Sequence, residues 1–198
     1  VLSADELDWI LGDQSKEAGR GGALRYRETG EIMGDIVNSH PLYSKAADAG
    51  YRAFRKPAAA TSNVAHYAND YPSFVAANKA HRPAAVYVGS NGGMLHAFDA
   101  TSLTELFAYV PRAVLGDLSY LTTPGYLHRY YVDGPVVAGD VVLDGKWRTV
   151  LVGTNGAGPK GVFALDITDP GDFKTSNVLW DIAGTDAETS IDYLGHIT

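Results

Sequence analysis

The sequence predicts a mainly all-β protein built from repeated four-stranded units, as in a partial β-propeller. Two observations support this prediction. A strand–turn–strand pattern occurs twice in the second half, and glycine and tyrosine are plentiful, at 22 and 12 of the 198 residues. Glycine supplies the backbone angles of tight turns, and tyrosine packs well on pleated sheets. We therefore expect about two to three four-stranded blades, fewer than a closed propeller needs.

The repeat is clearest around two Asn-Gly turns. Residues 86–93 and 150–156 each predict an apolar strand that runs into such a turn. Residues 94–101 and 162–168 then predict a second strand and an Asp-containing turn. Both second strands are nearly continuous apolar runs, which is typical of strands covered on both faces, as in stacked blades.

The spacing of the two copies differs slightly. Gly89 and Gly153 are 64 residues apart, whereas Asp99 and Asp166 are 67 residues apart. If these pairs occupy equivalent positions, the second copy has three extra residues in its loop. We expect both aspartates to bind the backbone N–H groups of turns rather than to act as an acid–base pair.

Each copy extends in both directions. Residues 105–110 and 178–182 predict a further apolar strand after each hairpin, and residues 35–42 and 131–137 predict an extended segment before it. Four strands in each copy are what a propeller blade requires.

These segments divide the chain as one fragment of a single propeller domain. Residues 1–34 form a helical lead-in, residues 35–110 a first blade unit, and residues 131–182 a second unit. The first unit contains an Ala-rich helical or loop insertion, residues 44–84, and residues 183–198 begin a next blade.

Two short helices are expected. Ser3 and Glu6 have the spacing of a capping box, which predicts a helix at the N-terminus. Residues 73–80 predict a second helix that ends before Pro83.

Composition excludes several classes of function. The formal net charge of −7 argues against nucleic-acid binding, and no apolar run of about 18 residues predicts a membrane span. Cysteine is absent, which excludes disulfides and thiolate metal sites. The chain begins with Val1 and no signal peptide, so we expect a segment of a longer protein with its leader upstream.

Several motifs resemble a known family. Residues 86–100 are similar to the strand signature of quinoprotein-like propellers. The chain then resembles one branch of that superfamily, the PilY/PilC-type propeller of type IV pilus biogenesis proteins, in residues 34–43, 107–111, 124–134 and 161–170.

The resemblance implies a function that is not enzymatic. It implies the propeller part of a long secreted protein at the pilus tip or cell surface, which supports pilus assembly against retraction and takes part in adhesion. The implied partners are pilus subunits or minor pilins and host or surface receptors.

The resemblance also bears on calcium. Propellers of this family can carry a calcium loop of the form D-x-D-x-D, whose oxygen ligands suit a hard cation. No such run occurs here, and residues 186–192 have the wrong spacing. We expect no cofactor in this segment, and calcium ligands of the whole protein beyond Thr198.

Two other functions are compatible with a propeller. A quinoprotein dehydrogenase would need a cofactor with a stacking platform, calcium and a catalytic carboxylate, and often adjacent cysteines. Trp147 and Trp180 instead predict strand core, and cysteine is absent. The other alternative is a general protein-binding scaffold.

Remaining motifs favour structural roles. Residues 156–161 match G-x-G-x-x-G, but a strand follows where a dinucleotide site needs a helix, so a hairpin turn is the better interpretation. His96 lies in an apolar strand, and His40 and His128 flank turns. Their spacing gives no zinc motif, and we expect packed or surface histidines.

The insertion is the candidate for partner binding, because loops carry binding while strands hold the scaffold. Its aromatic side chains are of the kind found at interfaces. They are Tyr43, Tyr51, Phe54, Tyr67 and Tyr71. The alternative is that they pack the insertion onto the blades.

Overall fold

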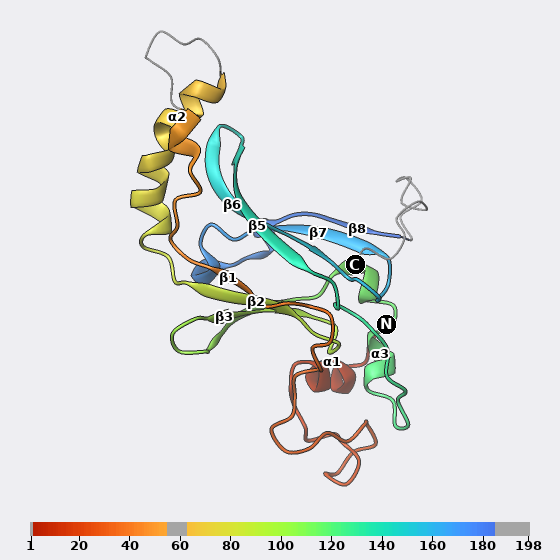
Figure 1. Ribbon diagram of the computed structural model, residues 1–198. Coiled ribbons are helices and arrows are strands. Elements are labelled where there is room, and N and C mark those ends of the chain that lie inside the picture. Colours follow the sequence, from red (N-terminus) through yellow and green to blue (C-terminus); the bar gives the residue numbers. More distant parts are fainter. Residues whose placement is uncertain (1, 55–62, 185–198) are drawn as a thin grey trace.

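Two four-stranded antiparallel sheets lie one above the other in the computed structural model, which describes residues 2–54 and 63–184 (Figure 1). Helices lie at the two ends of this layered pair, with α2 at one end and α1 and α3 at the other. The prediction of a mainly β fold made of four-stranded units is confirmed.

The first sheet has the order β1-β2-β3-β4. Its strands are short: β1 (Leu42–Ser44), β2 (Ala85–Gly89), β3 (Leu95–Asp99) and β4 (Glu105–Tyr109). The β2–β3 turn contains the first Asn-Gly pair of the repeat, as the sequence predicts.

The second sheet repeats this order as β5-β6-β7-β8 with longer strands. They are β5 (Val136–Leu143), β6 (Lys146–Thr154), β7 (Gly161–Asp166) and β8 (Val178–Ala183). Asp144 and Gly145 form the β5–β6 turn with φ angles of 48° and 73°, the left-handed conformation that a two-residue hairpin turn needs. The 156–161 segment joins β6 to β7, so its interpretation as a hairpin connection is confirmed.

The core lies between the sheets. Alternate side chains of both sheets are fully buried in one cluster: Tyr87, Leu95 and Ala97 from the first, and Leu151, Phe163 and Leu165 from the second. Burying apolar surface of this kind is the main driving force of folding.

A glycine at or next to the last residue of β2 and of β6 has a packing reason. A Cβ at Gly153 would lie 2.3 Å from the ring of Phe163, and a Cβ at Gly89 would lie 2.2 Å from the carbonyl oxygen of Val132. Both distances are far below contact, so each position requires the absence of a side chain.

Helices occupy the connections. At the N-terminus α1 (Ala4–Ile10) begins with the predicted capping box of Ser3 and Glu6. The β4–β5 connection contains the turn η3 (Arg112–Val114) and the short helix α3 (Leu118–Leu121), and the β7–β8 connection contains η4 (Pro170–Asp172) and η5 (Thr175–Asn177).

The β1–β2 connection contains η1 (Tyr51–Phe54), α2 (Asn63–Phe74) and the π-helical turn η2 (Val75–Lys79). The predicted helix over residues 73–80 is therefore too short at its N-terminal side. Pro72, a residue that usually marks a break, lies inside α2.

The predicted extended segments before each hairpin are largely irregular, because strands begin only at Leu42 and Val136. Side chains take the place of ladder hydrogen bonds there. The Asn38 backbone N–H donates to the Asp133 carboxylate at 3.0 Å, and the Gly89 N–H donates to Ser39 Oγ at 2.9 Å.

The register corrects the predicted equivalence of the two aspartates. Val150 pairs with Asp166, but Val86, its counterpart in the first repeat, pairs with Phe98. Asp99 therefore lies one position further along its strand than Asp166. By register, the β6–β7 connection is therefore four residues longer than the β2–β3 connection, not three. The count between the two aspartates gave three because it assumed that they occupy the same position on their strands.

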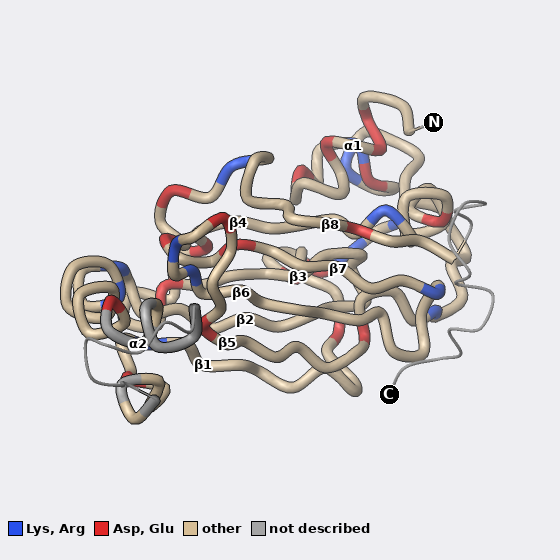
Figure 2. The backbone as a smooth tube through the Cα atoms, turned by 90° about the horizontal axis from the view of Figure 1, so that it is seen from above, with Lys and Arg blue, Asp and Glu red and all other residues tan. Residues whose placement is uncertain are grey.

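Charged residues lie mainly in the connections and at the ends of the molecule rather than along the strands (Figure 2). The connections are thus the places where charge chemistry can act.

Candidate functional site

The insertion packs against the β5–β6 hairpin of the second sheet, where α2 lies beside the far end of the hairpin (Figure 1). The contact centres on Asp140 of β5, whose side chain is almost fully buried. Its carboxylate accepts hydrogen bonds from Lys79 Nζ at 2.7 Å, Tyr71 Oη at 2.6 Å and Thr149 Oγ1 at 2.8 Å. One carboxylate thereby joins a helix, a turn and two strands.

The donors are themselves held by the insertion. Lys79 Nζ also donates to the carbonyl of Ala47 at 2.7 Å, and Tyr71 Oη accepts from the Ala49 N–H at 2.8 Å. Burial, together with the hydrogen bond to Asp140, raises the pKa of Tyr71 well above its ordinary value. Tyr71 therefore stays a neutral donor at every physiological pH.

Aromatic rings surround this contact. Trp147 of β6 lies 4.7 Å from the ring of Tyr71 and 5.0 Å from the ring of Tyr51, and the Phe74 ring stacks on it at 6.3 Å. The Trp147 indole N–H donates to the Tyr67 carbonyl at 2.8 Å. Edge and tilted contacts at such distances are favourable between aromatic rings.

The five aromatic residues predicted for partner binding are thus in different environments. Tyr71 is fully buried, and Tyr51 and Tyr67 take part in the docking contact. Tyr43 is 56% exposed, more than the other members whose side chains the structure describes. The side chain of Phe54 lies outside the described part.

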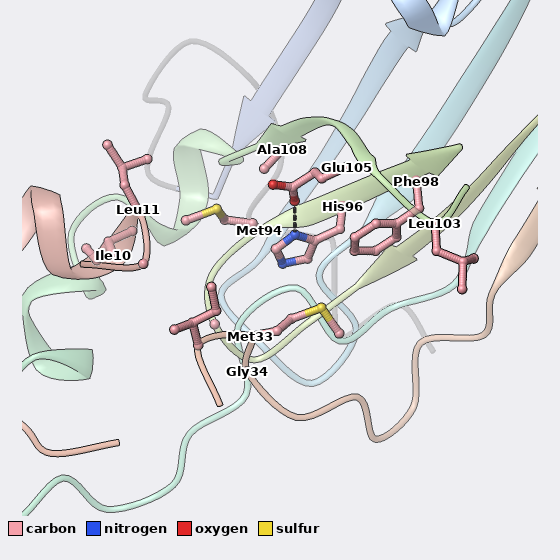
Figure 3. Close-up of a pocket in the computed structure, with 13 residues that line it drawn as sticks. Ile10, Leu11, Met33, Gly34, Met94, His96, Phe98, Leu103, Glu105 and Ala108 are labelled. Atoms are coloured by element: carbon pink, nitrogen blue, oxygen red, sulfur yellow. Dashed lines mark hydrogen bonds and ion pairs between the residues drawn. The ribbon is translucent and has the colours of Figure 1, made fainter. Parts of the chain in front are cut away.

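A second feature is a pocket of about 370 Å³ on the outer face of the first sheet. Figure 3 shows Ile10 and Leu11 approaching from the N-terminal segment, with His96 and Phe98 on β3. Its wall is mainly apolar, and His96 and Glu105 are its ionisable members. Sequence reasoning did not find this pocket, because the segments that form it are far apart in the chain.

His96 lies in a hydrogen-bonded relay. Its Nδ1 is 2.7 Å from Glu105 Oε1 and its Nε2 is 3.0 Å from Ser90 Oγ. The arrangement has the order of a Ser–His–acid triad. Ser90 is 1% exposed, does not line the pocket, and accepts a hydrogen bond from the Gly92 N–H at 3.2 Å. Because the Ser90 hydroxyl is enclosed, the relay orients His96, which is 9% exposed, within the expectation of packed or surface histidines.

The aspartates at the strand ends and Trp180 were also expected to have structural roles. Asp99 accepts from the N–H groups of Thr101 and Ser102, and Asp166 accepts from that of Thr168, so their role as turn acceptors is confirmed. Trp180 is 42% exposed, so its predicted place in the strand core is wrong.

Neither a metal-binding cluster nor a membrane-spanning helix is found in the part of the chain that the structure describes. Residues 2–54 and 63–184 contain no group of three or more His, Asp or Glu side chains placed to hold a metal ion. The acidic stretch 186–192 and most of the predicted next blade lie outside the described residues. None of the described helices combines the length and apolar character that a membrane crossing requires.

The fold and these contacts define a β-propeller-type scaffold with a docked insertion. A family model described as the PilY1 beta-propeller domain matches residues 33–194. The chain therefore belongs to the PilY1 β-propeller domain family.

Relatives agree with this assignment. A "Type IV pilus biogenesis factor PilY1 homolog" of Xylella fastidiosa is 47% identical over 186 residues, covering 93% of this chain and 14% of the relative. The "Type IV pilus biogenesis factor PilY1" of Pseudomonas aeruginosa strain PAK is 42% identical over 193 residues, covering 96% of this chain and 15% of the relative. The chain thus spans a small part of the length of these relatives.

A solved structure is also similar. The crystal structure of the Pseudomonas aeruginosa PilY1 C-terminal domain has 43% sequence identity and a TM-score of 0.45, over 58% of this chain and 21% of that chain.

Proposed function

We propose that this chain is part of a type IV pilus biogenesis factor that is not an enzyme, supports pilus assembly against retraction and takes part in attachment to surfaces or host cells. The observation that carries the proposal is the match of residues 33–194 to the PilY1 family, together with relatives named as pilus biogenesis factors.

The geometry supports a scaffold role. Two buried ionisable groups serve structural contacts: Asp140 fixes the insertion, and His96, at the wall of the larger pocket, is hydrogen-bonded through both ring nitrogens, to Ser90 and Glu105. Catalysis would instead require such groups to meet a substrate. The relatives named above are biogenesis factors, which gives the dehydrogenase alternative no support.

Partners and location follow from the same proposal. The partners are pilus subunits or minor pilins and surface or host receptors, and the protein acts outside the cell, at the pilus tip or cell surface. Calcium, where the whole protein binds it, uses residues beyond Thr198.

The test of assembly against retraction is a count of surface pili in two backgrounds. The region encoding residues 33–194 is deleted from the gene in cells with and without the retraction motor. We expect few pili in retraction-competent cells and near-normal numbers in cells that cannot retract. Equal loss in both backgrounds would contradict the role against retraction, and unchanged numbers in both would contradict any role in biogenesis.

Attachment is tested on the exposed member of the aromatic set. Tyr43→Ala in the whole protein should weaken attachment to surfaces while pilus numbers stay constant, because its ring is open to solvent. Tyr120→Ala is the matched control, since Tyr120 is similarly exposed but lies on α3. Equal attachment by the two variants would rule out Tyr43 as a contact.

A further inference from the structure

A small pocket of about 160 Å³ lies between the N-terminal segment and the β2–β3 turn of the first sheet. Two arginines, Arg25 and Arg27, lie in its wall beside Trp9. Two carboxylates, Glu31 and Asp35, belong to the same wall. The pocket therefore combines charge of both signs with an aromatic surface.

Arg25 is held firmly at this pocket. Its carbonyl accepts from the Trp9 indole N–H at 2.9 Å, and its backbone N–H donates to the Thr122 carbonyl at 2.7 Å. Its guanidinium carbon lies 5.0 Å from the Trp9 ring and 4.3 Å from the Tyr126 ring. Because the side chain is already ordered, little conformational entropy remains to be lost when it binds a ligand.

The two arginines differ in their charge partners. Arg27 Nε donates to Glu17 Oε1 at 2.7 Å, in an ion pair that Glu17 shares with Arg20. In the parts of the chain that the structure describes, Arg25 forms no ion pair, and its Nε is buried without an acceptor. Burial lowers the pKa of Arg25, although the negative charge of Glu17 acts in the opposite direction. A guanidinium keeps its charge in proteins, so the buried Nε–H of Arg25 is a donor that lacks an acceptor.

We propose that Arg25 and the pocket beside it bind a carboxylate group. A guanidinium presents parallel N–H donors that match the two oxygens of a carboxylate. One unpaired positive charge suits a monoanion, and the nearby carboxylates Glu31 and Asp35 disfavour a dianion such as phosphate.

The size of the pocket limits the ligand. Sites for drug-sized molecules typically enclose about 300–1,000 Å³, roughly twice this volume or more. The pocket of about 160 Å³ accommodates a carboxylate on a short stem: a small free acid, or the end of a polypeptide. This inference does not depend on the proposed pilus role.

The test uses the full chain with its tryptophans labelled at the indole nitrogen and observed by NMR. Probes are acetate, inorganic phosphate, and the dipeptide acetyl-Gly-Ala with either a free or an amidated C-terminus. We expect the Trp9 signal to shift saturably with the free-acid dipeptide and not with the amide. Trp147 and Trp180, which lie on the second sheet, serve as internal references.

Variants then assign the site. Arg25→Gln should abolish the saturable shift, and Arg25→Lys, which keeps the charge but loses the fork, should weaken binding by about tenfold or more. Glu31→Gln should tighten binding by removing a competing carboxylate. Arg129→Gln is the matched control, because Arg129 also stacks on a tyrosine, Tyr120, but does not line the pocket.

The outcomes are distinct. Saturable binding by both acetate and the free-acid dipeptide assigns a site for small acids, and binding by the dipeptide alone assigns a polypeptide terminus; both support a carboxylate site. Equal binding of the amidated dipeptide, tighter binding of phosphate than of acetate, or unchanged binding by folded Arg25→Lys protein would overturn it.

Discussion

The two sheets follow one sequence pattern, and each carries an added segment that a buried carboxylate holds. The two carboxylates differ in how far along the chain their hydrogen-bond donors lie. The N-terminal segment beside the first sheet is organised by Glu17, which accepts from Arg20 and Arg27, three and ten residues away. The insertion on the second sheet is held by Asp140, which accepts from Lys79 and Tyr71, 61 and 69 residues away.

The difference separates local from long-range order. Glu17 stabilises the shape of a loop, because its donors belong to the same segment. Asp140 joins parts of the chain that only the tertiary fold brings together, so its loss affects how the insertion is placed on the second sheet. The consequences of removing each group should differ in the same way.

The largest effect is expected from Asp140→Ala. Removing one partner of a buried pair leaves the Lys79 charge uncompensated, at a cost of about 3–5 kcal/mol. We expect hydrogen exchange to rise in residues 71–79 of the insertion while β7 remains protected.

The matched control for this change is Asp172→Ala. Lys174 and Asp172 are also 2.7 Å apart but are exposed, and exposed pairs contribute about 0–1 kcal/mol. Similar losses in free energy of unfolding for the two variants would show that burial of the Asp140 pair is not what matters.

The next effect concerns the chemistry of the same contact. In the double variant Lys79→Met, Asp140→Leu no charge is left buried, and such replacements are often neutral or stabilising. We expect most of the stability lost in Asp140→Ala to return, as measured by chemical denaturation. A double variant as unstable as Asp140→Ala would mean that the hydroxyl donors Tyr71 and Thr149 carry the contact.

The sequence predicted the sheets well because their signal is periodic. The Asn-Gly turns and the apolar strands follow from short-range geometry, and so does the capping box of Ser3. The start of α2 was missed because Pro72 is a local signal for a break, whereas packing of the neighbouring Tyr71 against the second sheet overrides it.

The candidate sites were much less predictable. Nothing in the spacing of Tyr71, Lys79 and Asp140 indicates a contact, since no helical or strand period links residues so far apart. The same holds for Arg25 and Tyr126. The sequence identified the insertion as an aromatic segment, but whether each ring binds a partner or packs inward depends on long-range contacts that composition does not encode.

A smaller effect on stability is expected at acidic pH, and it tests the role of Glu17. Burial alone would raise the pKa of Glu17, but the hydrogen bonds and positive charge of Arg27, with the charge of Arg20, outweigh it and lower the pKa below its usual value. A lowered pKa in the folded state stabilises the protein above the unfolded pKa of about 4.3, and this stability is lost as pH falls through the folded value.

The measurement is the free energy of unfolding from about pH 6 to about pH 3, the range in which carboxylates titrate. The chain should lose stability on acidification more steeply than Glu17→Gln, which cannot titrate at this position. Equal slopes for both proteins would mean that Glu17 titrates alike in the folded and unfolded states.

The smallest effect is expected at the start of α1. Ser3 Oγ accepts from the Glu6 N–H at 3.3 Å, and Glu6 Oε2 accepts from the Ser3 N–H at 2.7 Å. Ser3→Ala removes one half of this capping box, which costs about 0.5–2 kcal/mol. Because α1 lies beside the first sheet, the midpoint temperature of thermal unfolding should decrease modestly, and amide hydrogen exchange should rise first in residues 4–10.

The control is Ser73→Ala, which changes an exposed serine within α2. It should change stability little, since alanine is the better helix former. If Ser3→Ala instead increased exchange in residues 71–79, the two additions would be coupled, and their separate organisation by Glu17 and Asp140 would have to be abandoned.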